Sequence, residues 1–291
     1  MKIFDGKKIS QEILDSIKSE VLPWKKKPFM AVVSIGDGSS AYILQKKKAA
    51  EFLGFGFKHF SFNVSMSSAK FREELNRISK SKKNTAVIVQ LPLPEKINNS
   101  VLNVIPPEKD PDLLSDRAVG SFFNGRAIVE PPTPLAIIKI LEESKVVLEN
   151  KKVAVFGYGR LVGRFLVPML IKKGAAVSVI EKGLAKKDIL EISDKADIII
   201  SATGVPNSIT ADMVKTGAVV VDSGFSIVYP DHSKSGGIDG KIVGDVDFEA
   251  VKNKASLITP VPGGVGPMGV AMLCQNVAQL FKVFVSDVTS E

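Results

Sequence analysis

The sequence predicts an α/β fold made of two α/β domains with a cleft between them. Its 291 residues are enough for two domains of the typical size of about 150 residues each. Segments with strand-like and helix-like hydrophobic patterns alternate along the chain, which is typical of parallel sheets with crossover helices. A proline-rich stretch interrupts this alternation, which then resumes. We therefore expect a separate sheet in each half.

The first half reads as a βαβ domain. Ile13, Ile17 and Val21 recur at four-residue spacing, which predicts a helix over residues 10–24 with Ser10 as its N-cap. Strand-like segments follow at 30–35, 57–64 and 85–89, and helical patterns at 41–53 and 69–79 separate them. This βαβαβ order predicts a parallel sheet.

The second half predicts a Rossmann-like domain. Prolines gather in 105–112 and 130–134 and mark a boundary. After a helix at 135–143, strands are predicted at 153–156, 176–180, 197–202 and 218–222, with helices at 161–173 and 186–193. A turn-rich loop at 260–267 precedes a last helix, through Phe281, that is expected to pack on the first domain. The predicted domains are residues 1–133 plus 268–291, and residues 134–267.

Composition excludes several classes of protein. No apolar run approaches the roughly 18 residues that span a bilayer, and the start lacks a secretory segment, so we expect a cytoplasmic protein without a membrane partner. The lone cysteine, Cys274, lies in an apolar pattern and is interpreted as a small buried side chain. His59 and His232 have no spacing typical of a metal site, so no metal is expected.

The net charge of +8 favours either a nucleic acid or a small polyanionic ligand. The lysines are scattered, without aromatic residues between them and without a nucleic-acid motif. We interpret most of them as solvated and expect no nucleic-acid partner.

The stretch "FGYGRLVGRF" follows a predicted strand and precedes a predicted helix. Gly157, Gly159 and Gly163 give the spacing GxGxxxG, one residue longer than the usual dinucleotide fingerprint. The free N–H groups at the start of the helix favour a phosphate there. A tight turn with no ligand is the alternative.

Glu181 ends the next predicted strand, near the offset of about 20 residues at which an acidic residue binds a ribose hydroxyl. A carboxylate there repels a 2′-phosphate, which favours NAD over NADP. Lys182 is adjacent and offsets part of that repulsion, and a solvated strand end is the alternative interpretation of Glu181.

Lys46 occupies an apolar helix face. Tyr42, Lys46, Ala49 and Leu53 share that face, whereas Lys47 is rotated about 100° toward solvent. Desolvation would lower the pKa of Lys46, as a catalytic lysine requires. A lysine that only covers the core is the alternative.

Two further polar sites follow predicted strands. Gln90 ends the apolar strand of "AVIVQLPLP", at the edge where α/β folds bind ligands. Its amide would lie beside Lys46 if the two strands are neighbours. Asp110 and Asp112, in "PPEKDPDLL", are candidates for binding substrate N–H groups, but Asp-Pro-Asp is equally suited to a turn.

These stretches together resemble the bifunctional methylenetetrahydrofolate dehydrogenase/methenyltetrahydrofolate cyclohydrolase family. "SSAYILQKKKAAEFLGF" is similar to its YxxxK helix, "VIVQLPLP" to its glutamine strand, and "TPVPGGVGPM" to its signature near the C-terminus. "FDGKKIS" extends the resemblance to the first residues. The resemblance implies oxidation of 5,10-methylenetetrahydrofolate with NAD(P), then hydrolysis of the methenyl product to 10-formyltetrahydrofolate.

The resemblance also implies residue roles. Lys46 matches the catalytic lysine, Tyr42 the tyrosine that positions the pterin, and Gln90 the glutamine that tunes the lysine. Asp112, Pro262, Gly266 and Ser39 match substrate-side positions. On the cofactor side are Gly157, Tyr158, Gly159, Gly163, Glu181, Lys182 and Phe225. The family implies a homodimer built through the nucleotide domains.

The chain departs from the family mainly in the nucleotide loop, usually GRSxxVGxP. Tyr158 replaces the arginine that meets the NADP 2′-phosphate, Gly159 replaces the serine and Phe165 the proline. NADP is the family default, and these changes with Glu181 favour NAD. Leu113 and Leu114 also replace the Gly-Phe that follows the family aspartate. A cyclohydrolase with a weakened dehydrogenase, and a different Rossmann dehydrogenase, are the rival functions.

Overall fold

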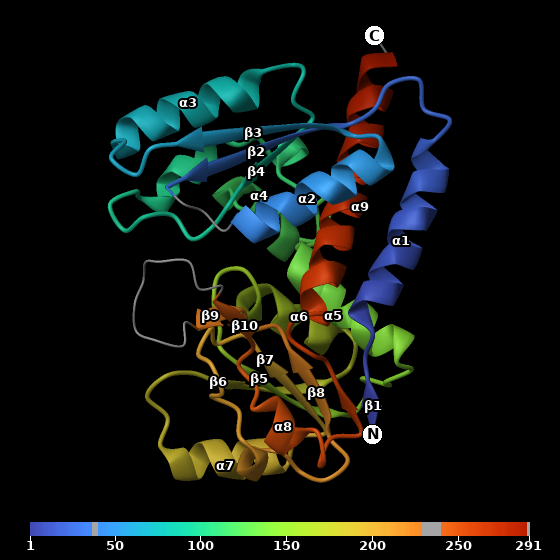
Figure 1. Cartoon of the computed structure of the whole chain (residues 1–291), viewed down its shortest axis with the longest axis vertical. Coiled ribbons are helices and arrows are strands. Elements are labelled where there is room, and N and C mark those ends of the chain that lie inside the picture. Colours follow the sequence, from blue (N-terminus) through green and yellow to red (C-terminus); the bar gives the residue numbers. More distant parts are fainter. Residues whose placement is uncertain (37–39, 229–239, 290–291) are drawn as a thin grey trace. The chain divides into compact units, whose positions relative to one another are not determined.

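The computed structural model describes residues 1–36, 40–228 and 240–289. Ser39 and His232, singled out above, lie outside these ranges. The chain forms two compact units (Figure 1), one of Gln11–Pro132 with the segment from Val270 onward, the other of Met1–Ser10 with Thr133–Gly269. We call them the lysine unit and the glycine-loop unit, after Lys46 and the loop at Gly157.

The lysine unit is built on a parallel sheet of three strands in the order β3-β2-β4. The central strand, β2 (Phe29–Ile35), pairs with β3 (Gly56–Phe62) and with β4 (Ala86–Val89). Helices α2 (Ser40–Leu53) and α3 (Ser68–Lys80) connect the strands. The predicted βαβαβ order is confirmed.

Alternating residues of β2 and β4 separate two hydrophobic clusters. Met30, Val32 and Ile88 face one cluster, which includes side chains of α1 (Gly6–Val21), α2 and α9 (Val265–Thr289). Ala31, Val33 and Val87 face the other, with the buried side of α3. Leu273, Cys274 and Val277 of α9 belong to the first cluster, so the predicted packing of the last helix on the first domain is confirmed.

Short helices surround the first proline-rich stretch of the lysine unit. The 3₁₀ turn η1 (Asn99–Val104) precedes it, the 3₁₀ turn η2 (Pro107–Lys109) lies in it, and the helix α4 (Asp116–Phe123) follows it. Ser115 caps α4 by accepting the N–H of Ala118. The sequence did not predict these elements, because each is shorter than the window of about 11 residues over which helical spacing is counted.

The glycine-loop unit contains a six-stranded parallel sheet in the order β1-β11-β8-β7-β5-β6. From edge to edge these are β1 (Lys2–Ile3), β11 (Leu257–Ile258), β8 (Val219–Asp222), β7 (Ile198–Ser201), β5 (Lys152–Phe156) and β6 (Ala176–Ile180). A separate antiparallel ribbon joins β9 (Ser226–Val228) and β10 (Lys241–Val243).

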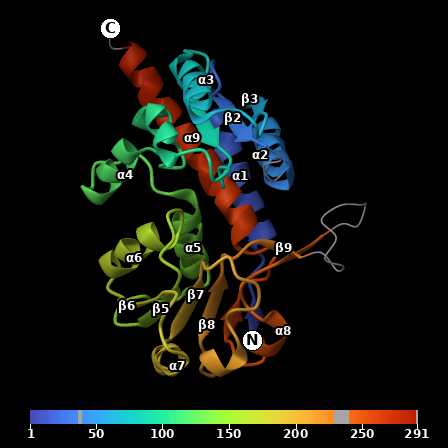
Figure 2. The same cartoon turned by 90° about the vertical axis from the view of Figure 1, so that its left-hand side faces the viewer.

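Helices cover the larger sheet. Helix α6 (Gly163–Lys172) packs on β5 and β6, while α7 (Lys186–Asp194) and α8 (Phe248–Val251) contribute to a cluster on the sheet with η3 (Ala211–Met213) (Figure 2). Helix α5 (Pro132–Glu143) follows the proline-rich stretch. The sequence does not predict β1, β9, β10 and β11, because strands of two or three residues are too short to show alternating apolar and polar side chains.

The first ten residues differ from expectation in two ways. They were expected in the first domain, but β1 pairs in parallel with β11 and so belongs to the glycine-loop unit. Ser10 is not an N-cap, because α1 begins at Gly6 and Asp5 accepts the N–H of Lys8. Gly6 approaches the backbone of Gly264 so closely that a Cβ there would lie 2.1 Å from the Gly264 oxygen.

Candidate active site

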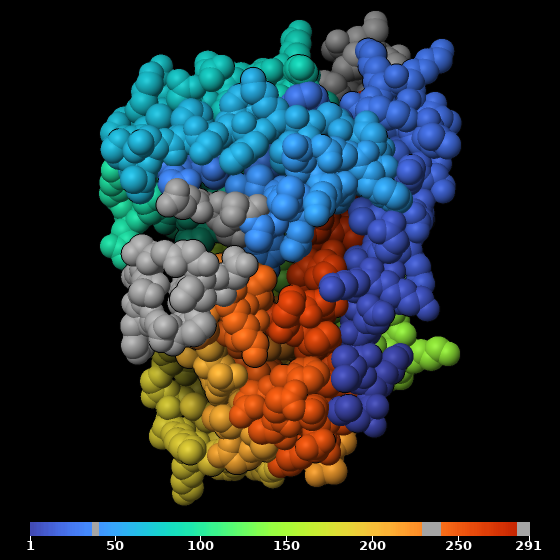
Figure 3. All heavy atoms as spheres, viewed as in Figure 1, coloured from blue at the N-terminus to red at the C-terminus, as the bar shows by residue number. Residues whose placement is uncertain are grey.

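Lys46 projects from α2 toward the end of β4. Its Nζ donates a hydrogen bond to Oε1 of Gln90 at 3.1 Å. The Lys46 side chain is half-buried, while Lys47 is exposed and pairs with Glu51 at 3.7 Å. The predicted contrast between the two lysines is confirmed, as is the contact of Lys46 with Gln90. Figure 3 shows α2 at the surface of its unit, and Lys47 and Lys48 on this helix are exposed.

Gln90 is oriented by its own strand end. Its backbone N–H donates to the Val33 oxygen at 2.8 Å, which continues the β2–β4 pairing by one residue. Its Nε2 donates to the Leu91 oxygen at 3.0 Å. With the NH₂ group held by a carbonyl, the amide oxygen is left to accept from Lys46. The amide therefore presents a fixed acceptor to the lysine.

Burial lowers the pKa of Lys46, and the negative charges of Asp112 and of an ionised Cys274 raise it in part. Burial raises the pKa of Asp112, and the charge of Lys46 lowers it. The two groups thus stabilise each other's ionised forms in a desolvated place. Burial raises the pKa of Cys274 to about 12, so this thiol stays protonated at neutral pH.

Tyr42 precedes Lys46 by one turn of α2, so the two side chains lie on the same face. Tyr42 is half-buried, and burial raises the pKa of its phenol. The structure therefore brings together Lys46, Gln90, Asp112 and Tyr42 in the lysine unit. Cys274 is an addition that helical spacing alone could not place beside Lys46.

The two aspartates of "KDPD" have different environments. Asp110 is fully buried, and its carboxylate accepts the N–H groups of Leu114 at 2.9 Å and Ser115 at 2.8 Å. Asp110 therefore serves the turn itself, and burial raises its pKa to about 6. Asp112 is half-buried and interacts with the charge of Lys46.

The glycine loop connects β5 to α6 in the other unit. Gly157 has φ +92°, and a Cβ at Gly163 would lie 2.0 Å from the Gly157 oxygen. Only glycine fits at either position: Gly157 has a positive φ and a Cβ there would lie 2.5 Å from the Ala202 oxygen, and Gly163 packs against the loop's own backbone. At Gly159, by contrast, a Cβ would meet nothing within 4 Å. No side chain caps α6 at Val162, which leaves this helix start suited to a phosphate.

Glu181 lies against this loop. Its Oε1 accepts the backbone N–H of Tyr158, and its Oε2 accepts the N–H of Lys182 at 3.3 Å. The Tyr158 side chain is 44% exposed beside this carboxylate. A negative charge thus stands at the end of β6, at the edge where open α/β sheets bind ligands.

A second polar cluster at that edge was not foreseen. Asp245 is buried and accepts from the Ser201 hydroxyl at 2.6 Å and from two N–H groups of the Thr203–Gly204 turn. Asp222 accepts the N–H groups of Gly224, Asp245 and Val246, and burial raises its pKa to about 6. The available signal was Asp222, the last residue of the apolar strand β8. Phe225, half-buried, follows this cluster.

The remaining candidates lie in the turn before α9. Pro262 is exposed, and Gly266 is half-buried in the first turn of that helix. Both belong to the glycine-loop unit. Among the described residues, no cluster of three or more His, Cys, Asp or Glu side chains is arranged to hold a metal ion. None of the described helices is long and apolar enough to cross a membrane.

Residues 4–112 match the family model "Tetrahydrofolate dehydrogenase/cyclohydrolase, catalytic domain", and residues 131–285 match "Tetrahydrofolate dehydrogenase/cyclohydrolase, NAD(P)-binding domain". The chain belongs to the tetrahydrofolate dehydrogenase/cyclohydrolase family. The bifunctional protein FolD of Hydrogenobaculum sp. is 40% identical over 288 residues, covering 97% of this chain and 99% of that protein.

Solved structures of the family superpose along the whole chain. The Trypanosoma brucei dehydrogenase-cyclohydrolase, complexed with NADP and an inhibitor, has a TM-score of 0.90 at 31% identity and covers 97% of this chain and 98% of its own. The Campylobacter jejuni bifunctional enzyme has a TM-score of 0.87 at 35% identity, with 97% and 99% covered. The predicted family and two-domain α/β fold are confirmed.

The close approach within the glycine loop predicts that two similar substitutions differ in their effect on stability. Gly163→Ala should lower the free energy of unfolding by about 1–3 kcal/mol, since its methyl group collides with backbone that cannot move freely. Gly159→Ala, where the added methyl meets open space, should leave stability unchanged. Thermal denaturation of both variants measures this. Equal melting temperatures would contradict the loop geometry.

Proposed function

We propose that this member of the family oxidises 5,10-methylenetetrahydrofolate with a nicotinamide dinucleotide and hydrolyses the methenyl product to 10-formyltetrahydrofolate, with Lys46 as the catalytic residue of the hydrolysis. One observation supports this role above the others: the desolvated Lys46 ammonium meets a fixed Gln90 oxygen at 3.1 Å and the charge of Asp112. Because burial lowers its pKa, this ammonium group gives up its proton more readily than a lysine in solvent.

The hydrolysis adds water to the methenyl carbon, and one proton leaves that water. The bond from this carbon to N5 then breaks as the remaining hydroxyl proton passes to N5, which leaves the formyl group on N10. Lys46, in its neutral form, can accept the first proton, and in its charged form it can stabilise the oxygen that develops negative charge. Gln90 keeps the ammonium group in one position, because its oxygen is the acceptor at the strand end. Positioning of this kind is a large part of catalysis.

The substrate-binding roles follow from chemistry and from resemblance. A half-buried carboxylate such as Asp112 suits the N–H groups of a pterin, and Tyr42 supplies a flat face beside it. Pro262, Gly266 and Ser39 are proposed on resemblance alone. The positive net charge of the chain favours the anionic glutamate tail of a folate.

The cofactor accepts the hydride when bound, and the loop that would hold it fits a dinucleotide. Gly157 and Gly163 allow the tight turn, and the start of α6 offers N–H groups to a pyrophosphate. The Glu181 carboxylate suits the ribose hydroxyls and repels a 2′-phosphate, so we propose a preference for NAD over NADP. Gly159, Tyr158, Lys182 and Phe225 complete the proposed cofactor side.

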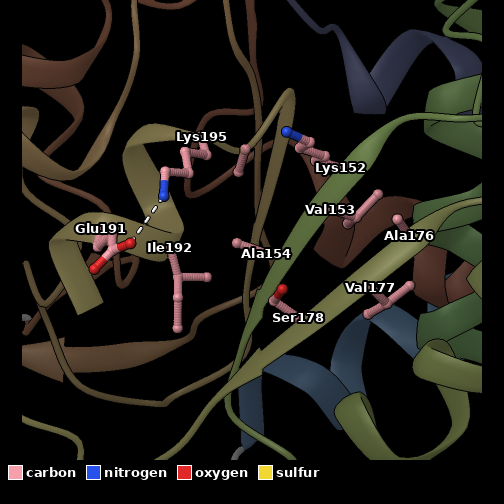
Figure 4. A pocket seen from close by; sticks show the side chains of 10 residues that line it. Lys152, Val153, Ala154, Ala176, Val177, Ser178, Glu191, Ile192 and Lys195 are labelled. Atoms are coloured by element: carbon pink, nitrogen blue, oxygen red, sulfur yellow. Dashed lines mark hydrogen bonds and ion pairs between the residues drawn. The ribbon is translucent and has the colours of Figure 1, made fainter. Parts of the chain in front are cut away.

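The proposed homodimer would form through the glycine-loop unit. Strand β6 is an edge strand whose sequence AVSVI has neither a charge nor a proline to prevent pairing. Beside it lies a hollow of about 330 Å³ lined by β5, β6 and α7 (Figure 4), with the small side chains of Ala154, Ala176 and Ser178 on the strands. An open edge beside a hollow suits a second copy of the chain. A cytoplasmic location stays a prediction.

Lys46→Met should lower the rate of methenyltetrahydrofolate hydrolysis by about 10²–10⁴-fold, because it removes the only proposed proton acceptor. The decay of methenyl absorbance measures the rate, and circular dichroism checks the fold. Lys47→Met, on the exposed side of the same helix, should retain the parental rate. A folded Lys46→Met variant with parental hydrolysis would refute the role.

The parent should have a higher kcat/KM with NAD than with NADP when methylenetetrahydrofolate is oxidised, followed by reduced-cofactor absorbance. Glu181→Ser should shift this preference toward NADP by roughly five- to tenfold, since two charges about 4 Å apart in water repel by about 1 kcal/mol. Asp188→Ser, an exposed change on α7, should shift nothing. Hydrolysis without oxidation by either cofactor would favour the rival, a cyclohydrolase with a weakened dehydrogenase.

Ser178→Lys should convert the dimer into a monomer, because it places a charge on the β6 edge that would pair. Size-exclusion chromatography with light scattering gives the mass. Ser65→Lys adds the same charge at an exposed turn of the lysine unit and should leave the dimer intact. A monomeric parent, or a dimeric Ser178→Lys variant, would exclude this interface.

A further inference from the structure

The turn that carries Asp112 is hydrogen-bonded to α9 through the side-chain amide of Asn276. We propose that Asn276, on α9, is a positioning residue for folate binding: it holds the turn of residues 110–115 so that Asp112 faces Lys46. This inference rests on the proposed function of Lys46 and Asp112. It adds a residue that touches neither the substrate nor the lysine in the proposed chemistry.

The contacts of Asn276 are directed at the turn and at the segment beside it. Its Nδ2 donates to the Pro111 oxygen at 2.9 Å and to the Glu130 oxygen at 2.6 Å. The side chain is 1% exposed, among the apolar residues of α9. A buried amide has a desolvation cost that an apolar residue would avoid, and two well-made hydrogen bonds offset it. Its position therefore indicates a specific tie rather than general packing.

The same turn is held from within by Asp110 and from outside by the neighbouring Lys109. The Asp110 carboxylate accepts the N–H groups of Leu114 and Ser115. The Lys109 ammonium donates to the oxygens of Ser79 at 2.9 Å and Ser81 at 2.8 Å, at the end of α3. Asp112 thus lies in a turn that Asp110 holds from within and that Lys109 ties to the end of α3.

Backbone strain explains why so many ties are needed. Leu113 has φ +52°, in the left-handed region that side chains other than glycine rarely adopt. Its side chain is 2% exposed, so burial helps to keep it there. Strained residues persist when their surroundings over-determine them. With the Asn276 tie removed, we expect the turn to relax and Asp112 to move.

Such a movement has a predictable electrostatic result. The charge of Asp112 raises the pKa of Lys46, and the other ionisable group acting on Lys46, Cys274, stays protonated at neutral pH. If Asp112 retreats, the pKa of Lys46 falls further. A purely structural residue would lower stability without moving this pKa.

The test compares Asn276→Leu with the matched control Gln279→Leu, using methenyltetrahydrofolate hydrolysis. Gln279 lies on the same helix and also donates to a backbone carbonyl, that of Ile128 at 2.6 Å, but it is exposed and does not contact the turn. Asn276→Leu should raise KM about tenfold, lower kcat less, and shift the Lys46 limb of the pH profile to lower pH. Gln279→Leu should change none of these.

A second pair keeps the test valid if Asn276→Leu does not fold. Leu113→Ala and Leu113→Gly both remove the side chain, but only glycine adopts φ +52° freely. Leu113→Gly should have the lower KM of the two. An inactive parent would refute the proposed function. With an active parent, an Asn276→Leu variant that folds and keeps the parental KM and pH profile would overturn the positioning role. If Asn276→Leu does not fold, an equal KM for the two Leu113 variants would overturn it.

Discussion

The removal of one ammonium group from water is the constraint on which the lysine unit depends. Lys46 lies on an otherwise apolar face of α2, and burial lowers its pKa. A buried charge needs partners. The Gln90 oxygen at the end of β4 and the charge of Asp112 supply them from two separate segments. The parallel pairing of β2 with β4, which sets where Gln90 emerges, therefore supports the chemistry proposed for Lys46.

The glycine-loop unit meets a different constraint, the close approach of backbone to backbone. A side chain at Gly163 would collide with the Gly157 oxygen and one at Gly157 with the Ala202 oxygen, whereas Gly159 has room. The unusual spacing GxGxxxG is thus compatible with a compact loop. Glu181 fastens the loop at Tyr158 and places its charge beside it. The Glu181 carboxylate therefore both holds the loop in place and gives it a negative charge.

The sequence predicted the central elements and the pair formed by Lys46 and Gln90, because α2 shows a helical period over 14 residues and β4 is a fully apolar run that ends before Gln90. It could not predict β1 or β11, whose two residues each gain meaning only through their pairing. Nor could it predict which aspartate of "KDPD" is internal to the turn. That distinction depends on the N–H groups of Leu114 and Ser115, which only the folded turn aims at Asp110.

The buried thiol of Cys274 has a practical consequence. Reaction with maleimides or iodoacetamides requires a thiolate, and this sulfur is shielded from solvent and has a pKa of about 12. A cysteine engineered on the surface would react far faster than the native one. Fluorescent dyes or spin labels can therefore be attached at chosen sites with the natural sequence of α9 left untouched.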